Sequence, residues 1–360
     1  MDSKTGPSGP ARAIRRRLGP MPGLDLLPLA QVPTPVEEVD LSGVLGRPAA
    51  RAWLKREDRS GAEMGGNKVR KLEWLLGAAI ARGSRSVVTS GGVGSNHALA
   101  TAYHAAEAGL EAHLAIFPHH VSDGSRRTLR AMCSMAAGVT FCPSDLLVPV
   151  VLAGVAGRLR VSGRRPSVIV PGGSQPVGTV GAVDLGLELA EQVAAGELDA
   201  PDAVFVPFGS GGTSVGLALG LQAGGVRCPV FAVRVYPLPL TSRAWLRTLA
   251  AGTVRLLRSA GAEMPAPDTR LLRVVGDQLG AGYAEPTEAA GAAREVGRAL
   301  GIALEATYSG KAFAAFLDAA GSPAWRGRNL VFVLTYDARI PAGLEAAPDD
   351  VVPSPLRRYL

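Results

Sequence analysis

The sequence predicts an α/β protein in which helices cover both faces of doubly wound parallel sheets. Short apolar runs rich in β-branched residues, such as 203–208 (AVFVPF) and 230–236 (VFAVRVY), alternate with longer stretches rich in alanine and leucine. Strands with a continuous apolar pattern are typical of parallel sheets buried on both faces. A chain of 360 residues is long enough for one large or two medium domains.

The expected elements alternate along the chain. We expect strands near 87–90, 112–117, 139–142, 168–171, 203–208, 230–236 and 330–336. We expect helices near 71–82, 95–108, 124–137, 178–195, 213–223, 242–260, 287–300 and 310–320. Ligands of such folds bind beyond the carboxyl ends of the strands, so a site is expected in the loops that follow strands.

Composition excludes several classes of protein. The chain is 47% hydrophobic and 19% charged, and no apolar run is long enough to span a bilayer, so we expect no membrane partner. The N-terminus lacks the apolar segment of a signal peptide. The three cysteines show neither metal-site nor disulfide spacing. These features predict a cytoplasmic protein without a metal site.

The first 24 residues are expected to form a disordered basic tail, because they are rich in glycine, proline and arginine. They contribute to a net charge of +7 for the whole chain. A basic tail can bind nucleic acid. No recognition motif or interleaved aromatic residues follow it, so a solvated arm without a nucleic-acid partner is favoured.

A glycine-rich turn joins an expected strand to an expected helix at 203–221 (AVFVPFGSGGTSVGLALGL). Gly209, Gly211 and Gly212 allow close approach of the backbone, and Ser210 and Thr213 add hydroxyl donors. The free N–H groups at the start of the helix favour an anion such as phosphate. The spacing fits neither a P-loop nor a dinucleotide fingerprint. A tight turn that simply needs glycines is the alternative.

Two more glycine-rich loops follow strands, at 91–97 and 171–181. Ser95 and Asn96 could cap a helix there or bind a ligand. Separately, the stretch GGNKVRKLEWLL places Lys68 after two glycines at the start of a helix, where the helix dipole disfavours a cation. A phosphate loop, a lysine in this setting and no metal cluster together suggest pyridoxal phosphate, which needs both an amine and phosphate donors.

Several segments, in this order along the chain, carry a family resemblance: PTPVEEVD, WLKRED with GGNKVRKLEWLL, GVGSNHA, PGGSQPVGTVG, GSGGT, GYAEPTEAAG and ATYSGKAFA. Over about residues 32–340 the chain resembles the 1-aminocyclopropane-1-carboxylate deaminase/D-cysteine desulfhydrase family of fold-type II (tryptophan synthase β-like) pyridoxal-phosphate enzymes. The resemblance implies a large cofactor-binding domain (25–69 plus 179–345), a small domain (70–178), a C-terminal tail (346–360) and a homodimer.

The resemblance also implies roles for individual residues. Lys68 would be the Schiff-base lysine and, with Ser95, Tyr283 and Tyr308, a catalytic residue. The other cofactor-binding positions would be Asn96 at the phenolic oxygen, Gly209, Ser210, Gly211, Gly212 and Thr213 at the phosphate, and Ser309 and Thr335 at the pyridine nitrogen. The positions facing the substrate would be Ser95, Asn96, His97 and Tyr336.

The resemblance favours one reaction over others. Ser309 stands where the deaminases have a glutamate, and a hydroxyl makes the cofactor a weaker electron sink than a carboxylate does. We therefore expect α,β-elimination from a small amino acid, as in a D-cysteine desulfhydrase, giving a keto acid and ammonia. Ring opening, β-substitution or racemisation in a specialised pathway, and a non-catalytic binding protein, are the alternatives. Residues 334–337 (LTYD) depart from the family's pattern in this segment. Because pocket contacts decide substrate choice, the identity of the substrate is left undetermined.

Overall fold

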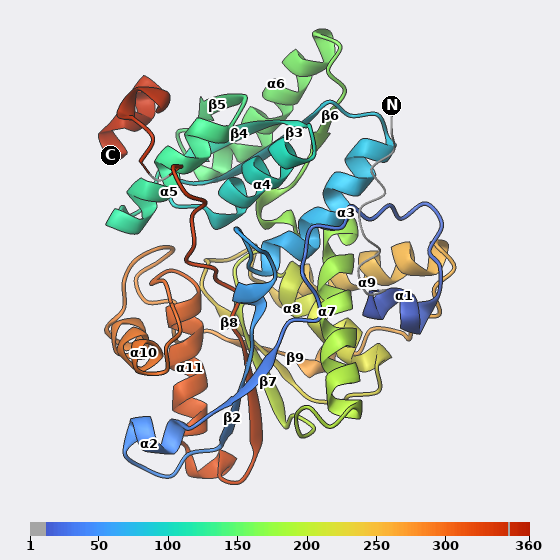
Figure 1. The fold of residues 1–360 in the computed structure, drawn as a ribbon, viewed down its shortest axis with the longest axis vertical. Helices are drawn as coiled ribbons and strands as arrows, with labels where there is room; N and C mark the ends of the chain where they lie inside the picture. The colour runs from blue at the N-terminus through green and yellow to red at the C-terminus, as the bar shows by residue number, and fades with distance from the viewer. Residues whose placement is uncertain (1–11, 345) are drawn as a thin grey trace.

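The computed structural model describes residues 12–344 and 346–360 and contains two sheets, one above the other in Figure 1. The larger sheet has the strand order β1-β2-β10-β7-β8-β9, and all pairs except β1–β2 are parallel. Its strands are β1 (Val36–Val39), β2 (Arg51–Lys55), β7 (Ala203–Phe208), β8 (Val230–Arg234), β9 (Leu272–Val275) and β10 (Asn329–Val333).

The smaller sheet is fully parallel, with the order β5-β4-β3-β6. Its strands are β3 (Ser86–Gly92), β4 (Glu111–Phe117), β5 (Gly138–Phe141) and β6 (Pro166–Val168). Every residue of β3 is buried, as expected for a central strand of a parallel sheet that is covered on both faces. The α/β class with parallel sheets is confirmed.

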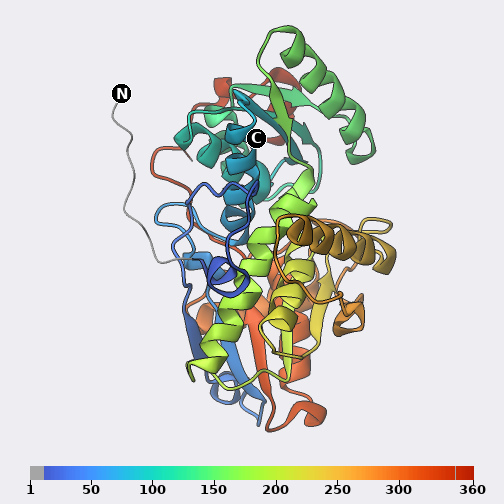
Figure 2. The same cartoon turned by 90° about the vertical axis from the view of Figure 1, so that its right-hand side faces the viewer.

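Helices cover both sheets (Figures 1 and 2). They are α1 (Ala13–Leu18), α2 (Leu41–Leu45), α3 (Asn67–Ala81), α4 (Asn96–Glu107), α5 (Asp123–Met135), α6 (Val148–Val161), α7 (Pro176–Ala194), α8 (Gly212–Ala223), α9 (Arg243–Ser259), α10 (Glu288–Ala299) and α11 (Ser309–Ala320). The sequence pattern does not predict α6, although its residues fill the connection between two expected parallel strands. No helix of the described residues has the length and apolar character to cross a membrane.

Helix α3, which carries Lys68 in its first turn, is fixed from behind by buried charges. The Arg70 guanidinium donates to Glu57 and to Glu188 at 2.8 Å each, and the Lys55 amine also contacts Glu188. All four side chains are almost fully buried. Buried charges are tolerated only when they are paired, so this network specifies one position of α3 against α7 and β2.

The predicted disorder of the first 24 residues is wrong for residues 12–24, while residues 1–11 lie outside the described residues. Helix α1 packs on α7, its Ile14 is fully buried, and the Ile14 amide donates to Asp184. Arg12 forms a buried ion pair with Glu73 of α3. The compositional argument failed because Ala13 and Ile14 supply apolar surface and Arg12 finds a buried partner.

The C-terminal residues cross from the larger sheet to the smaller one. After β10 the chain runs past the carboxyl ends of both sheets, and short 3-10 helices (Asp349–Val351 and Ser354–Tyr359) then lie beside α5 (Figure 1). Val352 and Leu356 are fully buried in the core that also contains Leu129. The segment expected as a tail is therefore packed structure.

Candidate active site

One cavity of about 770 Å³ lies where the loops after the strands of both sheets meet. It brings together most of the residues that the sequence analysis assigned to a site. These are Lys68, Ser95, Asn96, His97, Gly209, Ser210, Gly211, Thr213, Tyr283, Tyr308, Thr335 and Tyr336. Gly212 and Ser309 do not line it. Among the described residues, no three His, Cys, Asp or Glu side chains are grouped as metal ligands.

The loop before Lys68 is built by close backbone contacts. Gly66 has φ +85°, and a Cβ there would lie 3.0 Å from the carbonyl oxygen of Thr335. The backbone N–H of Asn67 donates to that same carbonyl at 3.2 Å. Glycine is required because only it adopts this conformation without strain while allowing so close an approach.

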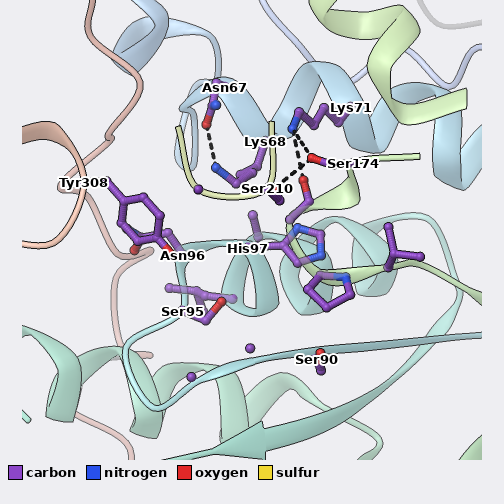
Figure 3. A pocket seen from close by; sticks show the side chains of 18 of the residues that line it. Asn67, Lys68, Lys71, Ser90, Ser95, Asn96, His97, Ser174, Ser210 and Tyr308 are labelled. Carbon is purple, nitrogen blue, oxygen red and sulfur yellow. Dashed lines mark hydrogen bonds between the residues drawn. The ribbon is translucent and has the colours of Figure 1, made fainter. Parts of the chain in front are cut away.

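The Lys68 amine points into the cavity, and Tyr308, Asn96 and Ser95 lie on the other side of that space (Figure 3). The Lys68 amine donates a hydrogen bond to Asn67 Oδ1 at 2.9 Å. Burial lowers the pKa of Lys68 to about 8, although the Glu305 carboxylate acts in the opposite direction. About a tenth of this amine is therefore neutral at pH 7, far more than for an ordinary lysine, and the neutral form is the one that acts as a nucleophile or a base.

The glycine-rich turn at the start of α8 forms a cradle with a second loop. Gly211 adopts a left-handed conformation, φ +89°, and the Trp245 indole donates to the Ser210 carbonyl at 2.9 Å. The hydroxyl of Ser174, from the loop 171–175, lies 2.7 Å from that of Ser210 and accepts the Gly212 amide at 2.9 Å. The glycine-rich turn is therefore held by Trp245 and by Ser174.

Lys71 is a functional candidate that the sequence analysis missed. Its amine lies 3.2 Å from Ser174 Oγ and 3.1 Å from the Gly172 carbonyl, at the mouth of the cradle (Figure 3). Burial and then the neighbouring Lys68 charge lower the pKa of Lys71 well below its usual value. An anion beside the amine would reverse that shift. One turn of helix separates Lys71 from Lys68, which is the only signal the sequence holds.

These residues fit pyridoxal phosphate. A Cβ on Gly212 would lie 2.6 Å from Ser174 Oγ and 2.8 Å from Lys71 Nζ, so only glycine leaves the cradle open. The N–H groups at the start of α8 and the Lys71 amine suit a phosphate group. Lys68 supplies a buried amine in the same cavity, as the cofactor's aldehyde requires.

The start of α4 presents three polar side chains, those of Ser95, Asn96 and His97. Ser95 caps the helix, accepting the Ala98 amide at 3.2 Å, so the capping interpretation is confirmed for this residue. The Thr89 hydroxyl donates to the Ile169 carbonyl at 2.8 Å and therefore accepts from His97 Nε2 at 3.0 Å. His97 Nδ1 is then an acceptor, and it has no partner among the described residues.

Two tyrosine hydroxyls meet at the cavity wall. Tyr283 and Tyr308 lie 2.7 Å apart at their oxygens, and the Tyr236 ring contacts Tyr283 with centroids 4.7 Å apart. Burial raises the pKa of Tyr283 to about 12 and that of Tyr308 well above its usual range. Both hydroxyls therefore remain protonated at neutral pH and can act as hydrogen-bond donors.

The assignment of Ser309 to the cofactor needs correction. Its side chain is fully buried, and its hydroxyl lies 3.1 Å from Glu305 Oε1 and accepts the Glu305 amide at 2.9 Å. Glu305 rather than Ser309 lines the cavity, and its carboxylate accepts the Tyr308 amide at 2.8 Å. Ser309 begins α11, and its position there turns the hydroxyl toward the preceding turn.

The altered segment after β10 shapes the approach to the cavity. Thr335 and Tyr336 line it, and Asp337 turns back to the loop before Lys68. Burial raises the pKa of Tyr336 to about 12. Tyr336, which the resemblance places facing the substrate, is a large side chain at the wall of this cavity.

Comparisons with known proteins agree with this geometry. Residues 27–335 match the family described as "Pyridoxal-phosphate dependent enzyme". The chain is 32% identical to D-cysteine desulfhydrase of Serratia proteamaculans, over 90% of this chain and 96% of that protein. It is 35% identical to nocardicin C-9' epimerase of Nocardia uniformis subsp. tsuyamanensis, over 84% and 90%.

A solved structure described as an ACC deaminase homologue superposes with a TM-score of 0.76, at 28% identity, over 91% of this chain and 94% of that one. The family match over residues 27–335 includes every strand of both sheets and most of the residues that line the cavity. The chain belongs to the pyridoxal-phosphate-dependent enzyme family.

Proposed function

We propose that this enzyme catalyses α,β-elimination from an amino acid of the cysteine type, giving a keto acid and ammonia, with release of the β-substituent. One observation carries the proposal: the cavity holds a potential base and a potential acid together. Lys68 has a pKa lowered to about 8, whereas the Tyr283–Tyr308 pair stays protonated. Elimination needs both, a base for the Cα proton and an acid for the leaving group.

Each polar group has a place in this reaction. The cradle formed by 209–213, Ser174 and Lys71 would hold the phosphate, and Asn96 would contact the cofactor ring. When bound, pyridoxal phosphate supplies an electron sink for the bond that breaks at Cα. Ser95 and His97 Nδ1 would orient the amino acid, and Thr335 would face the ring nitrogen. Lys68 would remove the Cα proton, and Tyr308 would deliver a proton from the opposite side.

The relatives support this choice of reaction, since one is named a D-cysteine desulfhydrase and another structure is described as an ACC deaminase homologue. The test uses the cofactor-loaded enzyme with D-cysteine, L-cysteine and 1-aminocyclopropane-1-carboxylate. Keto acid and sulfide in equal amounts from cysteine are expected. Exchange of the Cα proton in deuterium oxide, without keto acid, would instead indicate epimerisation, and no reaction with any of the three would overturn the proposal.

We also infer a cytoplasmic homodimer made of a large unit (25–69 plus 179–345) and a small one (70–178). All three cysteines are free and buried, which suits a reducing compartment. Leu146 and Val150 are 84% and 69% exposed, and a second copy could cover such apolar side chains. Light scattering of the purified protein would test the dimer, and a single mass equal to one chain would exclude it.

A further inference from the structure

The cavity continues beyond the proposed cofactor site along one face of α6. The residues of that face are Val148, Pro149, Leu152, Ala153, Ala156 and Arg160. Their spacing of one, three or four positions places them on one side of the helix. We call this extension the α6 groove. Leu240, in the loop before α9, and Trp245, at the start of α9, line the same cavity. Figure 2 shows α6 in green above α9 in gold.

The α6 groove is apolar along most of its length. Its inner wall is made by Phe117 and Val168, on strands of the smaller sheet. Ala153 and Ala156 occupy the middle of the helix face, and these short side chains leave space. From Pro149 to Arg160 the helix rises about 16 Å, so the α6 groove is longer than a cysteine side chain.

A polar atom marks the inner part of the α6 groove. The Ser90 hydroxyl lines the cavity, is 1% exposed, and has no hydrogen-bond partner among the described residues. Ser90 lies two positions after Val88, which packs against α6, so both side chains face that helix. A buried hydroxyl without a partner is costly and is usually satisfied by a ligand or water.

The inner end of the α6 groove also reaches the proposed acid. Asp145, just before α6, accepts a hydrogen bond from the Tyr236 hydroxyl. The Tyr236 ring contacts Tyr283, whose hydroxyl meets that of Tyr308. A group leaving from Cβ near these tyrosines would therefore have the apolar groove beside it.

We propose that the physiological substrate is an alanine whose β-substituent is a bulky apolar thioether, that is, a cysteine S-conjugate, and that this substituent lies in the α6 groove. This rests on the elimination proposed above. A cavity of about 770 Å³ falls in the range of roughly 300–1,000 Å³ that holds drug-sized ligands. The cofactor and a free cysteine would leave the α6 face uncovered.

The chemistry balances without another reactant except water. The Cα–H and Cβ–S bonds break, and the electron pair of the Cβ–S bond leaves with sulfur. The thiolate takes a proton and departs as a thiol. The remaining aminoacrylate tautomerises to an imine, and water hydrolyses it to pyruvate and ammonia. No oxidant or reductant is involved.

The test compares S-benzylcysteine with cysteine, each as the D and L isomers, on the cofactor-loaded enzyme. Pyruvate formation gives kcat/KM, and the change in cofactor absorbance on titration gives binding. We expect kcat/KM for one isomer of S-benzylcysteine to exceed that for cysteine by about tenfold or more, as apolar pockets discriminate by such factors. Ala153→Trp should remove that preference.

Val161→Trp is the matched control, because Val161 is 92% exposed on the same helix and does not line the cavity. Ala153→Leu is a milder block should the larger residue impair folding. Equal kcat/KM for both substrates, or a preference that Ala153→Trp leaves intact, would overturn the inference while cysteine elimination stands. Groove-dependent binding of S-benzylcysteine without pyruvate would support the substrate class and count against elimination.

Discussion

The carboxylate of Asp337 accepts the amide hydrogen of Gly65 at 2.7 Å, and these residues are 272 positions apart in the sequence. The same carboxylate pairs with Arg339, whose guanidinium donates to the carbonyls of Gly61 at 2.8 Å and Ala62 at 2.6 Å. The chain after β10 therefore holds the glycine-rich loop from which Lys68 projects. This relationship explains why an aspartate follows Tyr336.

Replacing Asp337 by alanine should loosen that loop and displace Lys68. Misplacement of a reacting group by about 1 Å can lower a rate by about 100-fold, so we expect kcat to fall by about 10- to 100-fold. The measurement is steady-state elimination, together with a thermal unfolding curve. Asp337→Asn keeps an oxygen acceptor for the Gly65 amide, so its kcat should lie between those of the parent and of Asp337→Ala. A kcat for Asp337→Ala within twofold of the parent would exclude this role.

Lys71 should control the affinity for the cofactor phosphate. Hydrogen bonds to charged groups contribute about 1.5–3 kcal/mol, so Lys71→Met should weaken pyridoxal-phosphate binding by about 10- to 150-fold. Fluorescence titration of the cofactor-free protein measures this directly.

Lys71→Arg retains the charge in a larger group and should lose less affinity than Lys71→Met. Pyridoxal, which lacks the phosphate, should bind the parent and Lys71→Met almost equally. If Lys71→Met weakens pyridoxal as much as pyridoxal phosphate, the effect is structural and the assignment to phosphate is wrong.

Capture of the cofactor should depend on pH through Lys68. Only the neutral amine attacks an aldehyde, and burial lowers the pKa of Lys68 to about 8. The rate at which cofactor-free protein forms its absorbing adduct should therefore rise with pH to a plateau, with a midpoint near 8. A midpoint near the ordinary lysine value of 10.5 would contradict the burial of this amine.

The same shift has a consequence for stability. Since the folded-state pKa lies below the unfolded value, the unfolded chain binds more protons between about pH 8 and 10.5. Lys68 therefore disfavours folding below pH 8, and this contribution fades as pH rises through the window. Lys68→Met should reduce the gain in stability between these pH values, as measured by urea denaturation of the cofactor-free protein.

The fold class could be predicted because parallel strands and their crossover helices leave local patterns. Strand β7 and the turn into α8 match their predicted positions. Helix α6 was missed because residues 148–161 (VPVVLAGVAGRLRV) are apolar nearly all round and contain Pro149, two glycines and several β-branched residues. Strands β1 and β2 were also missed, since VEEV and RAWLK mix charged with apolar residues.

Parts of the site could be predicted where all their residues lie in one segment of the sequence. They could not be predicted where two segments distant in the sequence must come together. The turn at 209–213 has its own signature, but Lys71 acquires its meaning from Gly172, 101 positions later. Ser309 was misassigned because sequence position gives no side-chain direction, and its hydroxyl turns to Glu305. The α6 groove depends on the same missed helix and has no sequence signature at all.

The ion pair between Arg12 and Glu73 should stabilise the whole fold, because it lies between α1 and α3. Glu73 also accepts the amides of Leu29 and Ala30 at 2.8 Å each. Burial raises the pKa of Glu73 to about 7, and the Arg12 charge opposes that rise. Removing one member of a buried pair costs about 3–5 kcal/mol, so Arg12→Ala should lower the free energy of unfolding by that order.

The pH dependence separates this ion pair from simple loss of packing. Glu73 has a folded-state pKa above its unfolded value of 4.5, so this group destabilises the fold as pH rises from about 4.5 to 7. Without Arg12 the pKa of Glu73 rises further, so the loss in Arg12→Ala should be larger at pH 8 than at pH 5. Urea denaturation at both pH values measures it, with the exposed Arg17→Ala as control. Glu73→Gln in the Arg12→Ala background should recover part of the loss, and equal losses at both pH values would mean that packing alone is involved.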